Sequence, residues 1–234
     1  MNAPARIETD VLVVGSGIAG LSFALKACRY ADVVLATKKE RVESNTNYAQ
    51  GGVAAVFDPD DSHTLHVADT LVAGAGLCHR RAVEELVREG PERVRELMDW
   101  GVRFSQGETG PELGREAGHS RRRILHAADL TGQEIERALL AAVAAEPRIQ
   151  VLEDHFVWEL ATVPEPGSTR TLCSGALVLD VRGAEWLEIN ARAVMLAAGG
   201  SGYLYRHTTN PAIATGDGIS LGYAAGAAVA NLEF

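Results

Sequence analysis

The chain has 234 residues, which is enough to bury a sizeable core in one large domain. Its 47% of apolar and 23% of charged residues are ordinary for a globular protein, and no apolar run reaches the roughly 18 residues of a membrane-spanning helix. The net charge of −9, from 22 basic and 31 acidic residues, argues against nucleic-acid binding, because such binding rests on neutralising phosphates.

The chain opens with a strand, a glycine-rich turn and a helix. Residues 10–14 predict a buried strand, residues 21–30 a helix, and residues 33–36 a second buried strand. The glycines between the first strand and the helix have the spacing GxGxxG, which lets the backbone approach a pyrophosphate at a helix N-terminus. A glycine-rich turn without a ligand is the alternative. The candidate contacts are Gly15, Ser16, Gly17, Ile18, Ala19 and Gly20.

The end of the second strand departs from the usual dinucleotide pattern. An acidic residue that accepts hydrogen bonds from ribose hydroxyls is expected there, but Thr37 and Lys38 occupy the position. Lys38 is either a phosphate contact or an ordinary solvated lysine. The departure disfavours a plain NAD dehydrogenase.

A short polar loop over residues 44–52 follows. Its amide and hydroxyl side chains suit the pyrimidine edge of a flavin and its phosphates, and its closing glycine pair permits close approach of the backbone. An ordinary polar surface loop explains the composition equally well. The candidate ligands are Asn45, Thr46, Asn47, Tyr48, Ala49, Gln50, Gly51 and Gly52.

The middle of the chain is predicted to be mainly helical. Residues 53–56 form a candidate short strand, and residues 65–73 and 82–100 have helical spacing. Thr131 and Glu134 have the spacing of a capping box before a helix over residues 135–145.

The last third of the chain returns to strands. Residues 149–152 begin this run, and three further apolar segments predict an antiparallel β-meander. Another buried strand, which precedes a glycine pair, completes the series. The meander segments are residues 157–163, 172–181 and 186–189, and the last buried strand is residues 193–197.

The glycine pair Gly199 and Gly200 and the acid Asp217 are further candidate ligand contacts. Asp217 opens a predicted helix over residues 216–226 and is either a hydroxyl-binding carboxylate or a first-turn acid. The whole pattern predicts an α/β fold, a Rossmann-like parallel sheet with an inserted β-meander. Residues 229–234 have a strand-like composition without a polar tail, so we expect the chain to be the N-terminal portion of a longer protein.

Read together and in this order, these motifs resemble the flavoprotein subunit family of succinate dehydrogenase and fumarate reductase, and within it the L-aspartate oxidases. The likeness covers the chain from about residue 10 to its end, so residues 1–234 are expected to be an FAD-binding domain without the family's capping and C-terminal parts. The segments that carry it are residues 13–21, 48–55, 69–77, 115–126 and 210–218.

The resemblance implies FAD as the cofactor and oxidation of L-aspartate to iminoaspartate, with oxygen or fumarate as acceptor. It implies a place in de novo NAD biosynthesis and quinolinate synthase as a partner. Asn45 stands where respiratory relatives have the histidine that tethers the flavin, so the FAD is expected to be non-covalent. Glu116 is expected to orient the amino acid through its ammonium group, with His119 as a second candidate site residue.

Other assignments stay open at this stage. A fumarate reductase or succinate dehydrogenase type of flavoprotein and a non-catalytic flavin-binding remnant are the alternatives, and the chain alone is expected to be inactive. Residues 121–123, three arginines, are either a solvated turn or a steering element for a dicarboxylate. His63, His66 and His126 are expected to be structural or exposed. Three scattered cysteines favour a cytoplasmic protein, and neither nucleic acid nor a membrane is an expected partner.

Overall fold

The computed structural model describes residues 4–108, 110–127, 130–168 and 170–233. The chain divides into two compact units. The first unit is Met1–Tyr48 together with Leu140–Phe234, and the second is Ala49–Leu139.

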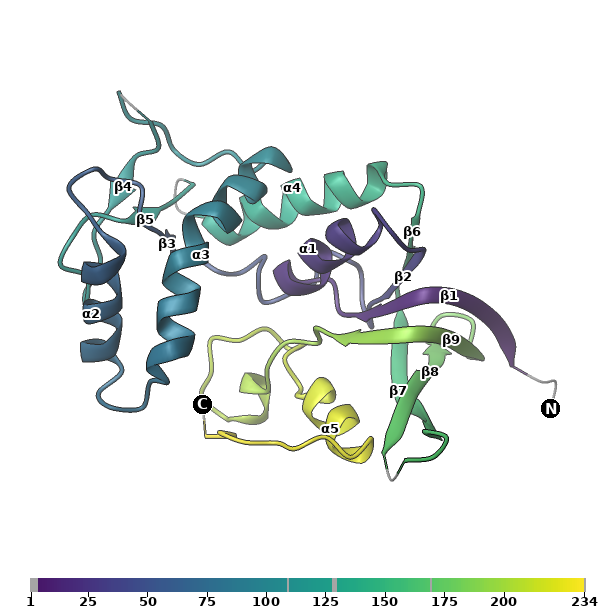
Figure 1. The fold of residues 1–234 in the computed structure, drawn as a ribbon. Coiled ribbons are helices and arrows are strands. Elements are labelled where there is room, and N and C mark those ends of the chain that lie inside the picture. Colours follow the sequence, from purple (N-terminus) through teal and green to yellow (C-terminus); the bar gives the residue numbers. More distant parts are fainter. Residues whose placement is uncertain (1–3, 109, 128–129, 169, 234) are drawn as a thin grey trace. The chain divides into compact units, whose positions relative to one another are not determined.

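A six-stranded sheet of order β6-β2-β1-β9-β8-β7 forms the first unit (Figure 1). The first four strands in this order, β6, β2, β1 and β9, are parallel to one another. Strand β8 pairs antiparallel with both of its neighbours, β9 and β7. This arrangement confirms the predicted parallel sheet with an inserted meander. The strands are β1 (Ala5–Val14), β2 (Val33–Ala36), β6 (Ile149–Leu152), β7 (His155–Pro164), β8 (Thr171–Asp180) and β9 (Glu185–Leu196).

The predicted βαβ unit is present. Helix α1 (Ile18–Ala27) joins β1 to β2, and the register pairs Val11 with Val33 and Val14 with Ala36. Leu21 and Ala24 of α1 are fully buried, and α1 packs against β1 and β2. The apolar strand ends and the apolar stripe of the helix therefore form one face of the core.

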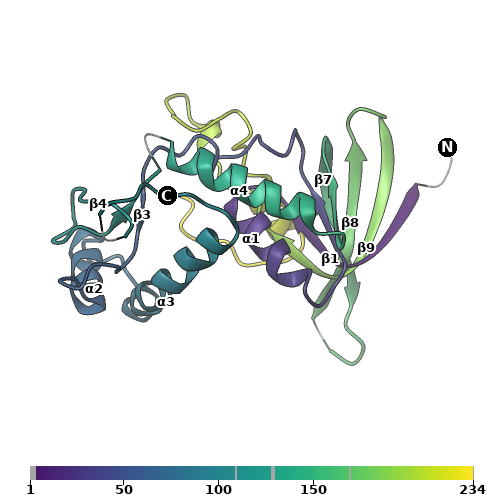
Figure 2. The ribbon, with the colours of Figure 1, turned by 90° about the horizontal axis from the view of Figure 1, so that it is seen from above.

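The long strand β9 corrects one expectation. The segments 186–189 and 193–197 were expected to be separate strands, but they belong to one strand (Figure 2). The first half of this strand pairs with β8, and the strand pairs with β1 along most of its length. The polar residues between them are satisfied across the β1–β9 pair. Asn190 donates to Glu8 at 2.7 Å, and Arg192 pairs with Asp10 at 3.4 Å. Cross-strand polar pairs thus keep the strand continuous where its apolar pattern stops.

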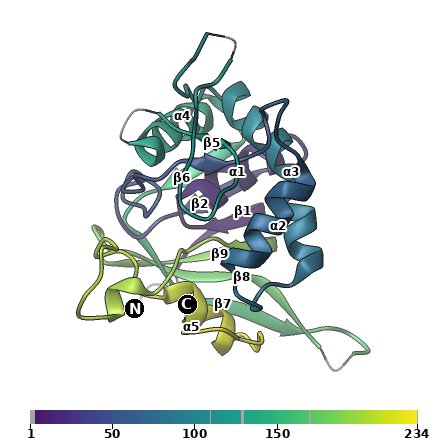
Figure 3. The same ribbon diagram turned by 90° about the vertical axis from the view of Figure 1, so that its left-hand side faces the viewer.

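The opposite face of the sheet carries a hydrophobic cluster of buried residues. It joins residues of β1, β2 and the meander to Leu221 of helix α5 (Asp217–Ala224). Helix α5 lies beside β7 (Figure 3). A short 3₁₀ helix, η1 (Gly202–Leu204), precedes α5. Described residues 229–233 form turn and coil, so the strand expected over 229–234 is wrong, and residue 234 lies outside the described part.

The second unit consists mainly of two neighbouring helices and a small sheet. Helices α2 (His63–Ala73) and α3 (Arg80–Asp99) pack against each other (Figures 1 and 3). The buried residues of α3 recur every three or four positions and include Val83, Val87 and Leu97. The small antiparallel sheet has the order β3-β5-β4. Its strands are β3 (Val53–Ala54), β4 (Leu113–Gly114) and β5 (Ile124–Leu125).

Helix α4 (Thr131–Ala145) belongs partly to each unit, and its predicted capping box is wrong. Thr131 is already helical, and its hydroxyl accepts from the amide of Ala127 at 3.2 Å. The carboxylate of Glu134 accepts from the amide of Arg103 at 2.9 Å and pairs with Arg137. Both side chains thus serve partners other than the backbone of their own first turn.

Candidate functional site

The first unit contains a cavity of about 660 Å³ at the carboxyl ends of β1, β2 and β9. Ligands of doubly wound sheets bind at this edge of the sheet. Several predicted contacts line the cavity, together with β7 residues that sequence reasoning did not single out. The predicted residues in the lining are Gly15, Ser16, Gly17, Ile18, Ala19, Lys38, Asn45, Thr46, Gly199 and Asp217, and the additional ones include His155 and Phe156.

The glycine turn has the geometry that its spacing predicts. Gly15 has φ of +108°, and a Cβ there would lie 2.4 Å from the carbonyl oxygen of Ala197. A Cβ on Gly20 would lie 2.0 Å from the carbonyl oxygen of Gly15. Only glycine permits both approaches, which bring β1, β9 and the start of α1 together. Gly20 does not line the cavity. Its role is to let the first turn of α1 pack closely against the backbone of Gly15.

The residues of the loop 44–52 are divided between the two units and do not all line one cavity. Asn45 and Thr46 lie at the first cavity, and Asn45 Nδ2 is 3.4 Å from the position of a Cβ on Gly199. The hydroxyl of Thr46 accepts from the amide of Ile18 at 3.0 Å and so satisfies an orphan donor at the start of α1. Gln50 and Gly52 belong to the second unit and line a cavity there. The remaining candidates Asn47, Tyr48, Ala49, Gly51 and Gly200 line neither cavity.

Lys38 is held in a polar cluster at the first cavity. Its Nζ donates to Thr215 Oγ1 at 2.5 Å and forms an ion pair with Asp217. Thr215 Oγ1 also donates to Asp217 Oδ1 at 2.8 Å. The side chains of Lys38 and Asp217 are 22% and 23% exposed, so Lys38 is not a freely solvated lysine. A carboxylate is thus present at this cavity on α5, although none stands at the end of β2.

These features fit a flavin dinucleotide. The turn gives backbone access beside a helix N-terminus, which attracts phosphate. Lys38 and Asp217, which are ion-paired with each other, add polar groups to the lining of the cavity. Ser16 and Thr37 also line the cavity, and their largely buried side chains are joined by a hydrogen bond of 3.1 Å between the hydroxyl groups.

The second unit contains another cavity of about 660 Å³, and it includes the predicted residue Glu116. The lining is formed by Gln50, Gly52, Gly114, Arg115, Glu116, Ile124, His126 and Leu130. His126 thus lies next to a candidate site, although the sequence alone did not distinguish it from a structural histidine. Within the described part of the chain, the Glu116 carboxylate has no hydrogen-bond or ion-pair partner.

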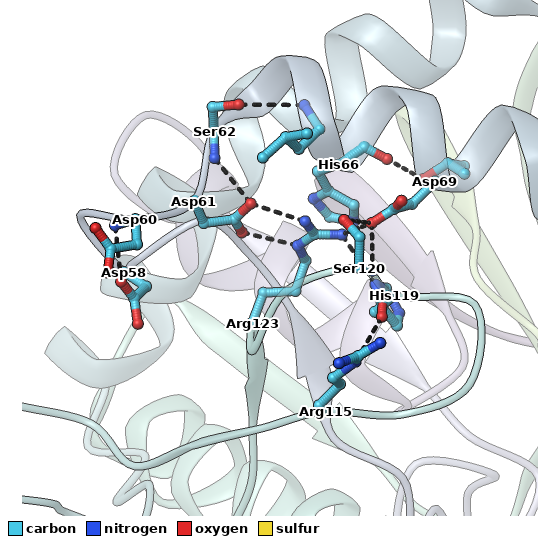
Figure 4. Close-up of polar contacts among 12 residues, drawn as sticks. Asp58, Asp60, Asp61, Ser62, His66, Asp69, Arg115, His119, Ser120 and Arg123 are labelled. Atoms are coloured by element: carbon cyan, nitrogen blue, oxygen red, sulfur yellow. Dashed lines mark hydrogen bonds and ion pairs between the residues drawn. The ribbon is translucent and has the colours of Figure 1, made fainter.

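His119 does not line this cavity but joins a buried ionic cluster (Figure 4). Its Nδ1 lies 3.2 Å from Nη1 of Arg123, which is 0% exposed. Arg123 donates to both oxygens of Asp61, at 2.8 and 2.7 Å, and to Asp69 at 2.5 Å. The expectation of a solvated or steering arginine is therefore wrong for Arg123, because two distant aspartates neutralise it in the interior.

Electrostatics in this cluster keep the carboxylates ionised. Burial raises the pKa of Asp61, but the hydrogen bonds from Arg123 and the Ser62 amide, together with the charge of Arg123, outweigh it, so the net pKa lies below its ordinary value. Burial also opposes the shift at Asp69, whose bonds from Ser120 and Arg123 bring its pKa to about 2. His66 is buried beside them. Its pKa is lowered by burial and by the charges of Arg123 and His119, which favours a neutral imidazole.

Comparison with known families identifies the family of the chain. The family described as FAD binding domain matches residues 10–234. The chain belongs to the FAD binding domain family. FAD is therefore its cofactor, and the resemblance inferred from the motifs is confirmed.

Named relatives of this FAD binding domain include L-aspartate oxidases. It is 48% identical over 226 residues to L-aspartate oxidase 2-a, chloroplastic, of Nicotiana tabacum, covering 96% of the chain and 35% of that protein. It is 45% identical over 241 residues to the L-aspartate oxidase of Vibrio cholerae, covering 100% of the chain and 45% of that protein. The chain thus spans less than half the length of these relatives.

Solved structures confirm the fold of this FAD binding domain. A variant of E. coli quinol fumarate reductase FrdA superposes with a TM-score of 0.84 at 32% identity, covering 93% of the chain and 37% of that structure. Among the described residues, no helix is both long and apolar enough to cross a membrane.

Proposed function

We propose that the chain is the part of an L-aspartate oxidase that binds FAD and recognises the amino acid. The whole enzyme would oxidise L-aspartate to iminoaspartate. Identity of 48% and 45% to two L-aspartate oxidases supports the reaction. The observation that carries the substrate assignment is the exposed Glu116 carboxylate, which has no partner among the described residues and lines a cavity together with Arg115 and His126.

Recognition of aspartate follows from the charges at this cavity. The carboxylate of Glu116 attracts the ammonium group of an amino acid and repels a carboxylate in the same position. Arg115 offers a positive charge for a substrate carboxylate. The cavity therefore favours an amino dicarboxylate over a dicarboxylate that lacks the amine.

The first cavity would hold FAD non-covalently. The turn from Gly15 to Ala19 would bind the pyrophosphate, and Lys38, Asn45 and Asp217 would contact the rest of the cofactor. The amide of Asn45 is not a nucleophile and cannot form the covalent link that a histidine makes. FAD, when bound, takes up the electrons removed from the substrate.

The wider role is part of the same proposal. Oxygen or fumarate would serve as the final acceptor, and iminoaspartate would pass to quinolinate synthase in de novo NAD biosynthesis. The cytoplasm stays the expected location, although the tobacco relative is named chloroplastic.

A fumarate reductase type of activity is the second candidate, favoured by the structural similarity to quinol fumarate reductase FrdA. A visible spectrum of the purified chain separates the two. We expect flavin bands in the isolated chain and, without oxygen, a shift of these bands on aspartate binding, without bleaching, that succinate does not produce. A response to succinate alone would favour the second candidate. Aspartate-dependent peroxide formation would contradict the expectation that the chain is inactive by itself.

A further inference from the structure

Asp69 connects helix α2 to the segment that carries Glu116, residues 115–120. Its Oδ2 accepts from Arg123 Nη1 at 2.5 Å, from the Ser120 amide at 2.7 Å and from Ser120 Oγ at 2.8 Å (Figure 4). Hydrogen bonds to an ionised acceptor are among the strongest in proteins. The C-terminal end of the segment is therefore anchored to a helix.

The rest of the segment is closed upon itself. Arg115 Nε donates to the carbonyl oxygen of His119 at 2.9 Å, and the His119 amide donates to the carbonyl oxygen of Glu116 at 3.3 Å. Gly118 has φ of +83°, which glycine adopts without strain. At the N-terminal end, the Arg123 amide donates to the carbonyl oxygen of Gly114 at 3.1 Å. Both ends of the turn thus meet at Arg123.

Charge balance alone does not explain the second aspartate. Asp61 already binds Arg123 through two parallel bonds, and both of these side chains are fully buried. One carboxylate neutralises one guanidinium, so Asp69 adds an excess negative charge at a desolvation cost. What Asp69 adds is the pair of bonds to Ser120.

The same contacts leave Glu116 available for a ligand. Arg115 is its neighbour in sequence, but the Arg115 Nε is engaged by the His119 carbonyl. In the described part of the chain, no ion pair joins Arg115 to Glu116. Arg115 therefore does not occupy the Glu116 carboxylate at the cavity.

We propose that Asp69 and Arg123 are positioning residues that hold Glu116 for recognition of a substrate ammonium group. This inference rests on the proposed function, which makes Glu116 the ammonium contact. The attraction between a carboxylate and an ammonium falls with distance, so a loosened turn weakens selection for the amine. Loss of the anchor should act on amino dicarboxylates and spare dicarboxylates without the amine.

The test compares four single variants and one double variant of the FAD-loaded 234-residue chain. Asp69→Asn and Ser120→Ala weaken the anchor, and Glu116→Gln removes the proposed contact. Asp60→Asn is the matched control, because it removes the same charge from the exposed loop before α2 and lies outside the contacts of Arg123. Hydrogen exchange of the Ser120 amide reports the turn, and calorimetric titration gives the dissociation constants of L-aspartate and succinate.

We expect Asp69→Asn to speed exchange of the Ser120 amide about tenfold and to weaken aspartate binding about five- to tenfold, with less than about a twofold change for succinate. Ser120→Ala should act in the same direction with a smaller effect. Asp60→Asn should change neither quantity. Adding Asp69→Asn to Glu116→Gln should weaken aspartate binding by less than about a further twofold, because the two residues act through one contact.

The failures are distinguishable. If Glu116→Gln shifts the preference for aspartate but Asp69→Asn leaves it unchanged, the positioning role is refuted and the proposed function stands. If Ser120 exchange is unaffected by Asp69→Asn, the anchor itself is refuted. If the unmodified chain binds aspartate no better than succinate, or Glu116→Gln has no effect, the recognition role of Glu116 fails and this inference fails with it.

Discussion

Gly20 offers a test of the idea that the glycine turn has separate packing and ligand-binding positions. A Cβ on Gly20 would lie 2.0 Å from the carbonyl oxygen of Gly15 and 3.3 Å from Val13 Cγ1. Ordinary contacts of a Cβ begin near 3.4 Å, so α1 must move away from β1 by a large part of the difference. The obstacle is backbone, which no change of rotamer can relieve.

The magnitude follows from these contacts. Overpacking costs about 1–3 kcal/mol, and a clash with backbone belongs at the upper end. The better helix propensity of alanine returns up to about 1 kcal/mol. Gly20→Ala should therefore lower the free energy of unfolding by about 2–3 kcal/mol and, for a domain of this size, lower Tm by roughly 5–10 °C.

Gly17→Ala should have the opposite profile. Gly17 has φ of −75° and ψ of 179°, which alanine adopts easily, and its Cβ would meet only Thr46 Oγ1 at 3.3 Å and Ser44 Cβ at 3.8 Å. The change in unfolding free energy should stay within about 1 kcal/mol. Because Gly17 lines the cavity, its methyl should weaken FAD binding by more than about tenfold.

Thermal unfolding by circular dichroism and titration of the apoprotein with FAD measure the two effects. Gly51→Ala is the control, because a Cβ there meets nothing within 4 Å. The reasoning is refuted if Gly20→Ala melts with the unmodified chain, or if Gly17→Ala loses stability as strongly as Gly20→Ala. It is also refuted if Gly17→Ala binds FAD normally.

Three further predictions concern the charged groups. The pKa of Asp69 is about 2 in the folded chain, against 3.8 as its ordinary value, so its contribution of on the order of 2 kcal/mol is present above about pH 4 and is lost as the pH falls toward 2. Urea unfolding of Asp69→Asn should lack this part of the acid dependence, and an identical dependence would contradict the shift. Asp217→Asn should weaken FAD binding about five- to twentyfold while changing Tm little, because Asp217 is partly exposed at the cavity; unchanged flavin titrations would count against its role. Acid precipitation should release all FAD from the holoprotein into the supernatant, and flavin absorbance retained in the pellet would contradict a non-covalent site with Asn45.

Local patterns determined much of the first unit. The apolar run before Gly15 and the spacing of three glycines predict a βαβ unit without knowledge of distant residues, because each element depends on its own periodicity and backbone freedom. The extent of β9 was not predictable in the same way. Asn190 and Arg192 interrupt its apolar pattern, and their partners Glu8 and Asp10 are 182 residues away in the sequence.

The candidate sites show the same division. The polar loop over residues 44–52 is continuous in sequence, but the fold assigns Asn45 and Thr46 to one unit and Gln50 and Gly52 to the other. No local property of the loop marks that boundary. Thr46 is a residue type that often contacts ligands, but in the structure its hydroxyl accepts a hydrogen bond from the amide of Ile18.

By itself, the sequence determined the α/β class, the nucleotide turn and the flavin family, because these depend on residue types at short, fixed spacings. Only the tertiary structure decided which of the three consecutive arginines is buried. They look alike in sequence, but only Arg123 is fully buried, because Asp61 and Asp69 lie within reach of its guanidinium. A buried charge requires partners that long-range folding brings to it. One of these partners, Asp69, joins Arg123 to the turn that carries Glu116.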